Sequence, residues 1–268
     1  MQQAGGPVTT QGKRAGSQIF RYSRPQSTKW ECHVLWEDPL FWICVLPGVL
    51  LGAYAQSGIK INMAKYSQVP TMNGITGAGV ARQLLDSQGL SKVAILATPG
   101  MLSDHYDPRS KTLRLSQEVY FAPSIAAAGI AAHEAGHALQ DAVDYFPMEA
   151  RTYIVPMVQL ATQTAPWVFI AGALLQLPTL AWIGVILFGS STLFALITLP
   201  VEFDASTRAK QLLISQHIIQ GDEQIAGVQK VLGAAAWTYL AAAVSAIGSW
   251  LFYIFVLLSP ARPSAYRN

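Results

Sequence analysis

Four long stretches of the chain contain no charged residue, and they limit its fold more than any other feature. They cover residues 40–55, 153–177, 179–201 and 234–258. A helix needs about 20 consecutive apolar residues to cross the hydrocarbon core of a bilayer, and the first stretch is near the lower limit. With 51% hydrophobic and 12% charged residues, the chain is too apolar for an ordinary soluble protein. We therefore predict a mainly α-helical, multi-pass membrane protein with about four transmembrane helices.

Three of these stretches have an alternative interpretation. The first could be a cleaved signal peptide, but such a peptide starts nearer the N-terminus and ends in small residues, so we interpret it as an anchor. A soluble helical hairpin is the alternative for residues 153–201, and the absence of charge argues against it. Pro156 and Pro166 predict a kink in the second span, whose Gln159 and Gln163 we expect to face protein and not lipid.

The polar parts of the chain separate these spans. Residues 1–35 are predicted to be a disordered basic tail, with a targeting segment as the alternative, because residues 1–30 carry Lys and Arg but no Asp or Glu. Residues 56–152 are predicted to be an aqueous domain, residues 202–232 an amphipathic segment and residues 259–268 a short tail. The net charge of +3 forms no basic stripe, so the expected partners are the bilayer and a polypeptide, not a nucleic acid.

The aqueous domain has the pattern of a small α+β unit. Thr76 is placed to cap a helix that runs to about Gln88. Residues 92–97 and 112–116 alternate as strands and are separated by a loop over residues 99–111. Cys32 and Cys44 stand apart from this domain and indicate neither a disulfide framework nor a Cys-based metal site.

The segment Ala132-His-Glu-Ala-Gly-His-Ala138 carries the chemically capable side chains of this domain. Residues four apart lie on one face of a helix, so His133 and His137 can bind the same cation. Glu134 lies one step round the helix, where it can act as a general base on a metal-bound water. A core helix with two hydrogen-bonded histidines is the alternative. We favour a metal, since it satisfies two buried imidazoles and a carboxylate most simply.

A catalytic zinc needs three protein ligands and an open position, so two histidines are an incomplete site. His33 precedes the first span and His217 lies in an amphipathic segment, which makes both poor candidates. Glu202 follows the third span, and two crossings return the chain to the side of the histidines. We predict Glu202 as the third ligand and Asp204 as a residue that orients a ligand, with the two roles exchangeable. The alternative is that both are interfacial carboxylates paired with a nearby arginine.

Three segments in this order, DHYDPRSKTLRLS, HEAGHALQ and LPVEFDAS, resemble the YugP-like neutral zinc metallopeptidases of bacterial membranes. The resemblance covers most of residues 40–258 and implies a multi-pass membrane peptidase. The family is similar in layout to gluzincin membrane proteases, in which a glutamate on a later helix completes the zinc site, and this maps onto Glu202. Many gluzincins have an Asp four residues after that glutamate. This chain has Ser206 there, which leaves Asp204 to fill the orienting role.

These observations predict a membrane zinc endopeptidase with one Zn²⁺ per chain, Glu134 as general base, and a site near the headgroup layer of a bacterial-type plasma membrane. Its substrates would be membrane proteins or membrane-near peptides. Lysines and arginines beside the spans favour a cytoplasmic site only slightly. A metal-stabilised scaffold without activity is the non-enzymatic alternative. An intramembrane site-2-type protease is disfavoured, because charged, turn-rich sequence flanks the motif.

Two further expectations concern the substrate. The alternating residues Thr112 to Ser116 are predicted to be an edge strand that pairs with an extended peptide through Leu113, Arg114 and Leu115. His105 is a candidate to stabilise the oxyanion, with an ordinary surface histidine as the alternative.

Overall fold

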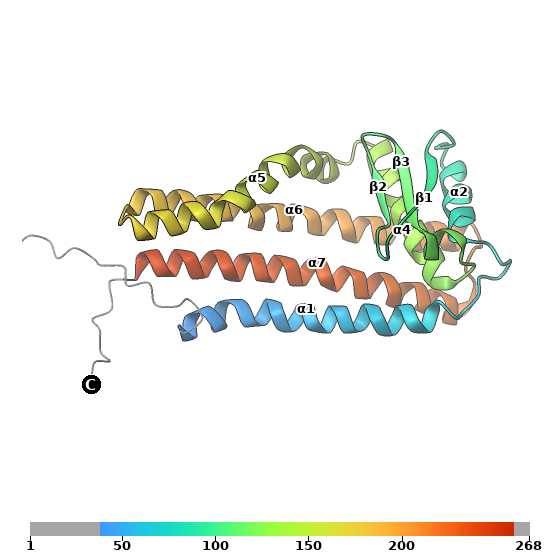
Figure 1. Ribbon diagram of the computed structural model, residues 1–268. Helices are drawn as coiled ribbons and strands as arrows, with labels where there is room; N and C mark the ends of the chain where they lie inside the picture. Colours follow the sequence, from blue (N-terminus) through green and yellow to red (C-terminus); the bar gives the residue numbers. More distant parts are fainter. Residues whose placement is uncertain (1–37, 260–268) are drawn as a thin grey trace, which may run out of the picture.

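Four long helices form most of the molecule and run side by side (Figure 1). They are α1 (Pro39–Tyr66), α5 (Phe146–Leu174), α6 (Pro178–Ser215) and α7 (Gly221–Leu258). The computed structural model describes residues 38–259, and within this range these four helices are long and apolar enough to cross a membrane. α5 packs on α6, α6 on α7, and α7 on α1. The predicted multi-pass helical architecture is confirmed, whereas the predictions for residues 1–35 and most of the C-terminal tail lie outside the described range.

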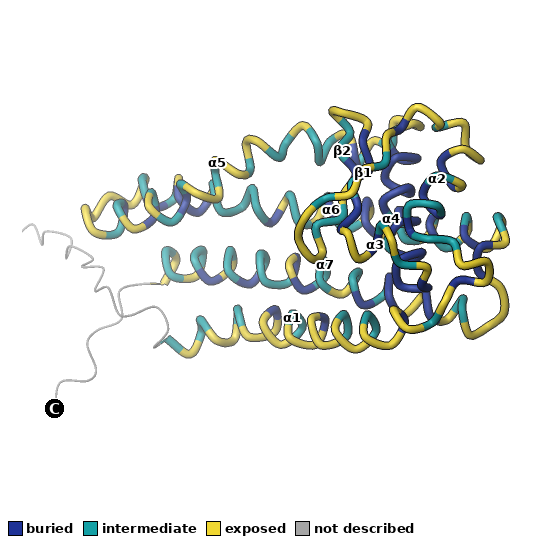
Figure 2. The backbone as a smooth tube through the Cα atoms, turned by 45° about the vertical axis from the view of Figure 1, so that its right-hand side comes forward, coloured by how far each residue is buried: buried dark blue, intermediate teal, exposed yellow. Residues whose placement is uncertain are grey.

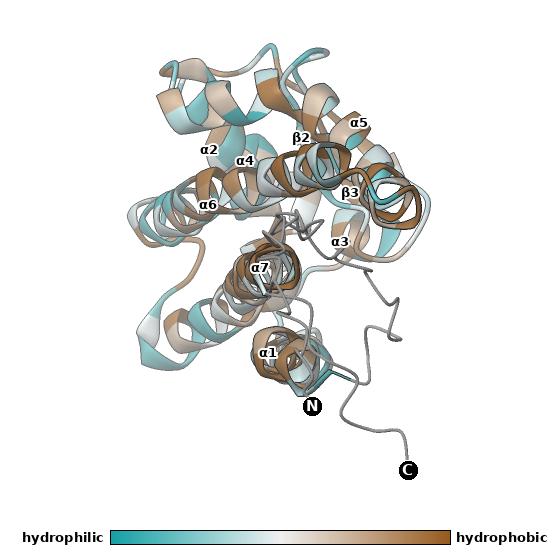
Figure 3. Cartoon of the chain, turned by 90° about the vertical axis from the view of Figure 1, so that its left-hand side faces the viewer, coloured by the Kyte–Doolittle hydropathy of each residue, from teal (hydrophilic) through white to brown (hydrophobic). Residues whose placement is uncertain are grey.

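The helices α6 and α7 are too long to lie wholly within a bilayer. Each has 38 residues and is therefore about 57 Å long at 1.5 Å per residue. The hydrocarbon core is about 30 Å thick, so each helix continues for several turns outside it. Figure 3 shows their hydrophobic stretches and the more hydrophilic ends. The predicted amphipathic segment over residues 202–232 is therefore the end of α6, a short turn and the beginning of α7. Likewise, α1 continues well beyond residue 55, where the first span was expected to end.

A small α+β domain lies at one end of the bundle, on the right in Figure 1. Its helices are α2 (Gly77–Ser87), α3 (Gln117–Phe121) and α4 (Ile125–Ala142), and its strands are β1 (Ala94–Thr98), β2 (His105–Asp107) and β3 (Thr112–Ser116). α2 begins as predicted, because the Thr76 hydroxyl accepts a hydrogen bond from the Gly79 amide at 3.2 Å. The two predicted strands correspond to β1 and β3. β2 lies inside the predicted loop and is too short for alternation to reveal it.

The strand β3 lies in the middle of the three-stranded sheet, so the expectation that it is an edge strand is wrong. β1 pairs with it in parallel and β2 in antiparallel register. Because both sides of β3 are occupied, Leu113, Arg114 and Leu115 cannot receive a peptide by strand addition. The two leucines are fully buried in the domain core, and Arg114 lies 3.7 Å from Asp107 of β2.

A hydrogen-bonded group holds the sheet against the end of α4. The Tyr106 hydroxyl donates to the Asp141 carboxylate at 2.6 Å, and the Lys111 ammonium lies 2.6 Å from the same oxygen. Burial of the phenol and the adjacent Asp141 raise the pKa of Tyr106 well above its usual value. The phenol therefore remains a hydrogen-bond donor throughout the ordinary pH range.

Buried residues gather around α4, whereas the four long helices are largely exposed along their lengths (Figure 2). α4 is rich in alanine, and its small side chains let α2, α6 and α7 pack closely around it. The exposed surfaces of the long helices carry large apolar residues such as Leu50, Trp167 and Ile186. Apolar side chains on the outside and a buried core at one end are the distribution expected for a bundle in lipid with a domain outside it.

The second span differs from expectation in one respect. Pro156 and Pro166 lie inside α5, and Figure 1 shows this helix bent, as predicted. However, Gln159 and Gln163 are exposed, so the expectation that they face protein is wrong. α5 packs mainly on α6, and the opposite face of the helix has no neighbour among the described residues to cover these amides.

α4 and α6 approach each other closely at Gly136, the glycine of the His-Glu-Ala-Gly-His motif. A Cβ atom at this position would lie 2.7 Å from the carbonyl oxygen of Ala205 on α6. Real side chains do not tolerate so short a contact with backbone atoms, so only glycine permits this helix separation. The glycine therefore determines how near the residues of α6 come to the two histidines.

We expect Gly136→Ala to lower the free energy of unfolding by about 1–3 kcal/mol, since the added methyl group must push the two helices apart. Gly129→Ala on the same helix is the matched control, because the nearest atom to its added methyl group is 3.7 Å away. Thermal unfolding of the purified proteins in detergent measures the difference. Equal midpoints for the two variants would show that the close approach does not constrain the helices.

Candidate metal centre

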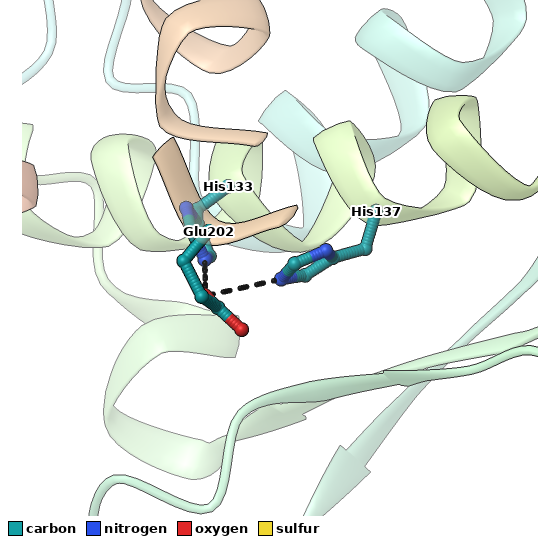
Figure 4. Close-up of side chains that lie close together, drawn as sticks. All are labelled: His133, His137 and Glu202. Atoms are coloured by element: carbon teal, nitrogen blue, oxygen red, sulfur yellow. Dashed lines mark hydrogen bonds and ion pairs between the residues drawn. The ribbon is translucent and has the colours of Figure 1, made fainter. Parts of the chain in front are cut away.

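Three side chains from two helices converge on one point, as Figure 4 shows. His133 and His137 extend from α4, and Glu202 extends from α6. The Nε2 atom of His133 lies 3.1 Å from a Glu202 carboxylate oxygen, and that of His137 lies 3.6 Å from the same oxygen. One donor atom from each residue lies within 4.8 Å of the other two. The structure thus brings together the three residues that the sequence marked as metal ligands.

The helix α4 presents both histidines because its local sequence forms a regular helix through the motif. Its first turn is capped by Ser124, whose hydroxyl accepts from the Ala127 amide at 3.3 Å. The two imidazole rings lie on the same face, with centroids 4.7 Å apart and planes at 84°. Both Nε2 atoms face Glu202, so one cation could contact both rings.

Glu202 is only 2% exposed, and a buried carboxylate must be paired with positive charge or hydrogen-bond donors. Its second carboxylate oxygen receives a hydrogen bond from the Arg151 guanidinium of α5 at 2.8 Å. The Tyr239 side chain of α7 also lies close enough to Glu202 to interact with it. Neither partner was predicted from the sequence. Arg151 stood out only as a charge beside a span, and nothing in the sequence around Tyr239 distinguishes it from other residues of the apolar α7.

The Nδ1 atom of each histidine is fixed by a separate hydrogen bond. That of His133 lies 3.1 Å from the Ser206 hydroxyl. That of His137 lies 2.9 Å from the side-chain oxygen of Gln140, which is completely buried. These contacts fix the orientation of both rings and leave both Nε2 atoms free to bind a metal.

Asp204 acts on this arrangement through an intermediary. Its carboxylate accepts from the Gln140 amide at 2.8 Å and from Arg208 at 2.6 Å. Asp204 thereby fixes Gln140, and Gln140 fixes His137. Of the two carboxylates whose roles were exchangeable, Glu202 joins the histidines and Asp204 lies behind them. Ser206 contacts His133 directly. The sequence had argued against a ligand-orienting role for this residue, because many gluzincins have an aspartate at its position.

Burial alone would lower the pKa of His137, but the adjacent carboxylates of Glu202 and Glu134 outweigh this effect. The pKa of His137 is consequently raised above its ordinary value. The buried group therefore attracts positive charge, and a bound cation would replace the proton.

Glu134 lies next to His133 on α4 and lines a cavity that opens at the site. It is mostly buried, and no described residue forms a hydrogen bond with its carboxylate. His105 is an exposed residue of β2, where its Nδ1 atom lies 2.8 Å from the Ser103 carbonyl oxygen. It is absent from the described residues that line this cavity.

Comparison with known proteins agrees with this geometry. Residues 41–258 match a family described as "Putative neutral zinc metallopeptidase". The chain belongs to this family. It is also 43% identical over 220 residues to the "Putative membrane protease YugP" of Bacillus subtilis (strain 168), and the match covers 82% of this chain and 97% of that protein. No solved structure gives a significant match.

A zinc ion, which the family description implies, fits the residues present at this site. Two imidazole nitrogens and one carboxylate oxygen are a ligand set of catalytic zinc sites. The donor atoms lie close enough to share one ion, and each histidine has the hydrogen bond behind it that such ligands require. The burial of Glu202 also has a reason, since a divalent cation would compensate its charge.

The Ser206 contact yields a direct test. We expect Ser206→Ala to weaken zinc binding by about 10-fold to 100-fold, because the His133 ring loses the group that orients it. Competition with a zinc chelator measures the affinity. Thr207→Ala is the matched control, because among the described residues that hydroxyl bonds to the Phe203 carbonyl oxygen of its own helix and not to a histidine. Unchanged affinity in the Ser206 variant would mean that the ring is oriented by other contacts.

Proposed function

We propose that this protein is a membrane-embedded zinc endopeptidase that hydrolyses peptide bonds of membrane or membrane-proximal proteins. The observation that supports this most strongly is the buried group of His133, His137 and Glu202 beside Glu134, whose carboxylate has no hydrogen bond from the described residues. The two histidines and Glu202 are the ligands of one zinc ion per chain. A zinc ion so bound polarises the scissile carbonyl group and lowers the pKa of water towards about 7.

The general base of the reaction is Glu134. Its carboxylate takes a proton from the water that attacks the carbonyl carbon, and it returns the proton to the nitrogen of the departing amine. The lack of a hydrogen bond to Glu134 from the described residues supports this role, since the carboxylate oxygens are available to the attacking water.

Other residues hold the reacting groups in position. Arg151 restrains the Glu202 carboxylate from α5, while Ser206 and Gln140 fix the two rings. The site is thus held by helices that are anchored in the membrane, and rigid supports of this kind keep reacting groups in position.

The position of the site along the helices suggests which substrates reach it. Glu202 directly follows the uncharged stretch of α6. Arg151 lies just before the uncharged stretch of α5. The reaction centre therefore lies near the headgroup layer, and its substrates are polypeptides held at or in the membrane. Lys60, Lys210 and Lys230 lie on the same end of the helices, which favours a cytoplasmic site in a bacterial-type plasma membrane.

We expect Glu134→Gln to reduce kcat/KM for a membrane-peptide substrate by about 100-fold or more while the protein retains its zinc. The amide cannot accept the proton, but it occupies the same space and is not a ligand. Cleavage assays with casein and membrane peptides, together with metal analysis of the same samples, test this. If both proteins retain zinc and neither cleaves any substrate, the protein is a metal-stabilised scaffold and the proposed function is wrong.

A further inference from the structure

An apolar cavity of about 150 Å³ lies directly beside the proposed reaction centre. His133 and Glu134 form part of its wall. Most of the remaining wall is apolar and comes from α1, α4 and α7, namely Ile59, Met63, Ile130, Val231, Leu232 and Ala235. An occupant of the cavity would therefore touch apolar side chains on most sides and the reacting groups on one.

The polar groups at this cavity are few, and apart from the two residues of the motif they are Asp104 and Tyr239. The Asp104 carboxylate accepts from the Ser116 amide at 2.7 Å and from its hydroxyl at 3.1 Å. Tyr239 lies next to the buried Glu202. A charged side chain whose end lay among the apolar residues of the wall would lose its hydration without a partner there, which is costly. An apolar side chain loses no such hydration and gains contacts with the wall.

The volume restricts the occupant further. An apolar protein cavity of about 150 Å³ can hold a benzene ring. Leucine, methionine and phenylalanine side chains are therefore suitable in size, whereas alanine would leave most of the space unfilled. Wall atoms that face empty space make no van der Waals contacts on that side, so a larger apolar side chain binds better.

The place of the cavity in the fold indicates how a substrate arrives. Two walls belong to the long helices α1 and α7, and Ile59 immediately precedes Lys60 at the aqueous end of α1. Besides α1, α7 and α4, the aqueous domain contributes Leu102 to the wall, and this residue is 64% exposed in the loop after β1. The cavity thus lies between the membrane helices and the aqueous domain, where an apolar segment leaving the bilayer would pass.

We propose that this cavity is a specificity pocket for a large apolar side chain, such as leucine, methionine or phenylalanine, of the residue adjoining the scissile bond. This inference rests on the proposed peptidase function and adds the substrate class. The enzyme then cleaves membrane-proximal segments at apolar positions, close to where they enter the bilayer.

Two variants that fill the pocket test the proposal. Ile59→Trp adds volume from α1, and Ala235→Leu adds volume from α7. Ile61→Trp is the matched control, because Ile61 lies two residues further along α1 and is 66% exposed. Zinc content and thermal midpoint are measured for each protein, so that a variant that fails to fold is recognised.

The substrates are peptides that differ only in the residue adjoining the scissile bond. Wild type and Ile61→Trp should prefer leucine or phenylalanine over alanine by about 10-fold or more in kcat/KM. Either filled variant should lose that preference, because kcat/KM should fall much further for the leucine and phenylalanine peptides than for the alanine peptide. A preference that survives both substitutions, or a preference for lysine over leucine, would overturn the proposal.

A binding measurement separates this inference from the proposed function. Hydroxamate inhibitors with a methyl, isobutyl or benzyl side chain can be compared by their affinity for the zinc-loaded protein, whether or not it cleaves peptides. Tighter binding of the isobutyl or benzyl compound, lost in Ile59→Trp and retained in Ile61→Trp, supports the pocket even if no peptide is hydrolysed. Equal affinities for all three compounds in wild type would contradict the pocket, even for an active peptidase.

Discussion

The buried carboxylate of Glu202 is the interaction on which this arrangement depends. It joins α6 to both histidines of α4 and, through Arg151, to α5. A carboxylate that is 2% exposed would be strongly destabilising without these partners. Glu202 therefore links the membrane helices to the aqueous domain. The close approach of α4 and α6 at Gly136 makes this link possible, since a larger residue there would separate the helices.

The extension of α6 and α7 beyond the bilayer gives the site its setting. The same two helices form membrane spans along one part of their length and the wall of the domain along another. A site supported in this way cannot move far from the membrane surface. This constraint, more than any single side chain, connects the proposed chemistry to substrates that are themselves held at the membrane.

Much of this organisation follows from the sequence because its signals are local or topological. The spacing of His133 and His137 predicts their shared face, and the absence of charge predicts the spans. Glu202 could be selected because two crossings return the chain to the same side. The role of Gln140 could also have been predicted, since it lies three residues after His137 on the same helix and can contact its ring.

Other features depend on contacts between distant segments and have no local signal. The alternation of β3 identifies a strand but not its neighbours, so its central position in the sheet could not be seen. β2 is a strand mainly because β3 lies beside it. Tyr239 belongs to an apolar helix more than 100 residues after the motif, and only the packing of α7 against α4 brings it to the site. Gln159 and Gln163 were misplaced because the sequence does not reveal which face of α5 packs on α6.

The central claim is that His133, His137 and Glu202 together hold one zinc ion. X-ray absorption spectroscopy at the zinc edge of the purified protein, combined with metal analysis, tests it most directly. We expect one zinc per chain, with two imidazole nitrogens at about 2.0–2.1 Å and the remaining ligands oxygen. A spectrum with sulfur ligands at about 2.3 Å, a single imidazole, or no zinc retained would contradict the account.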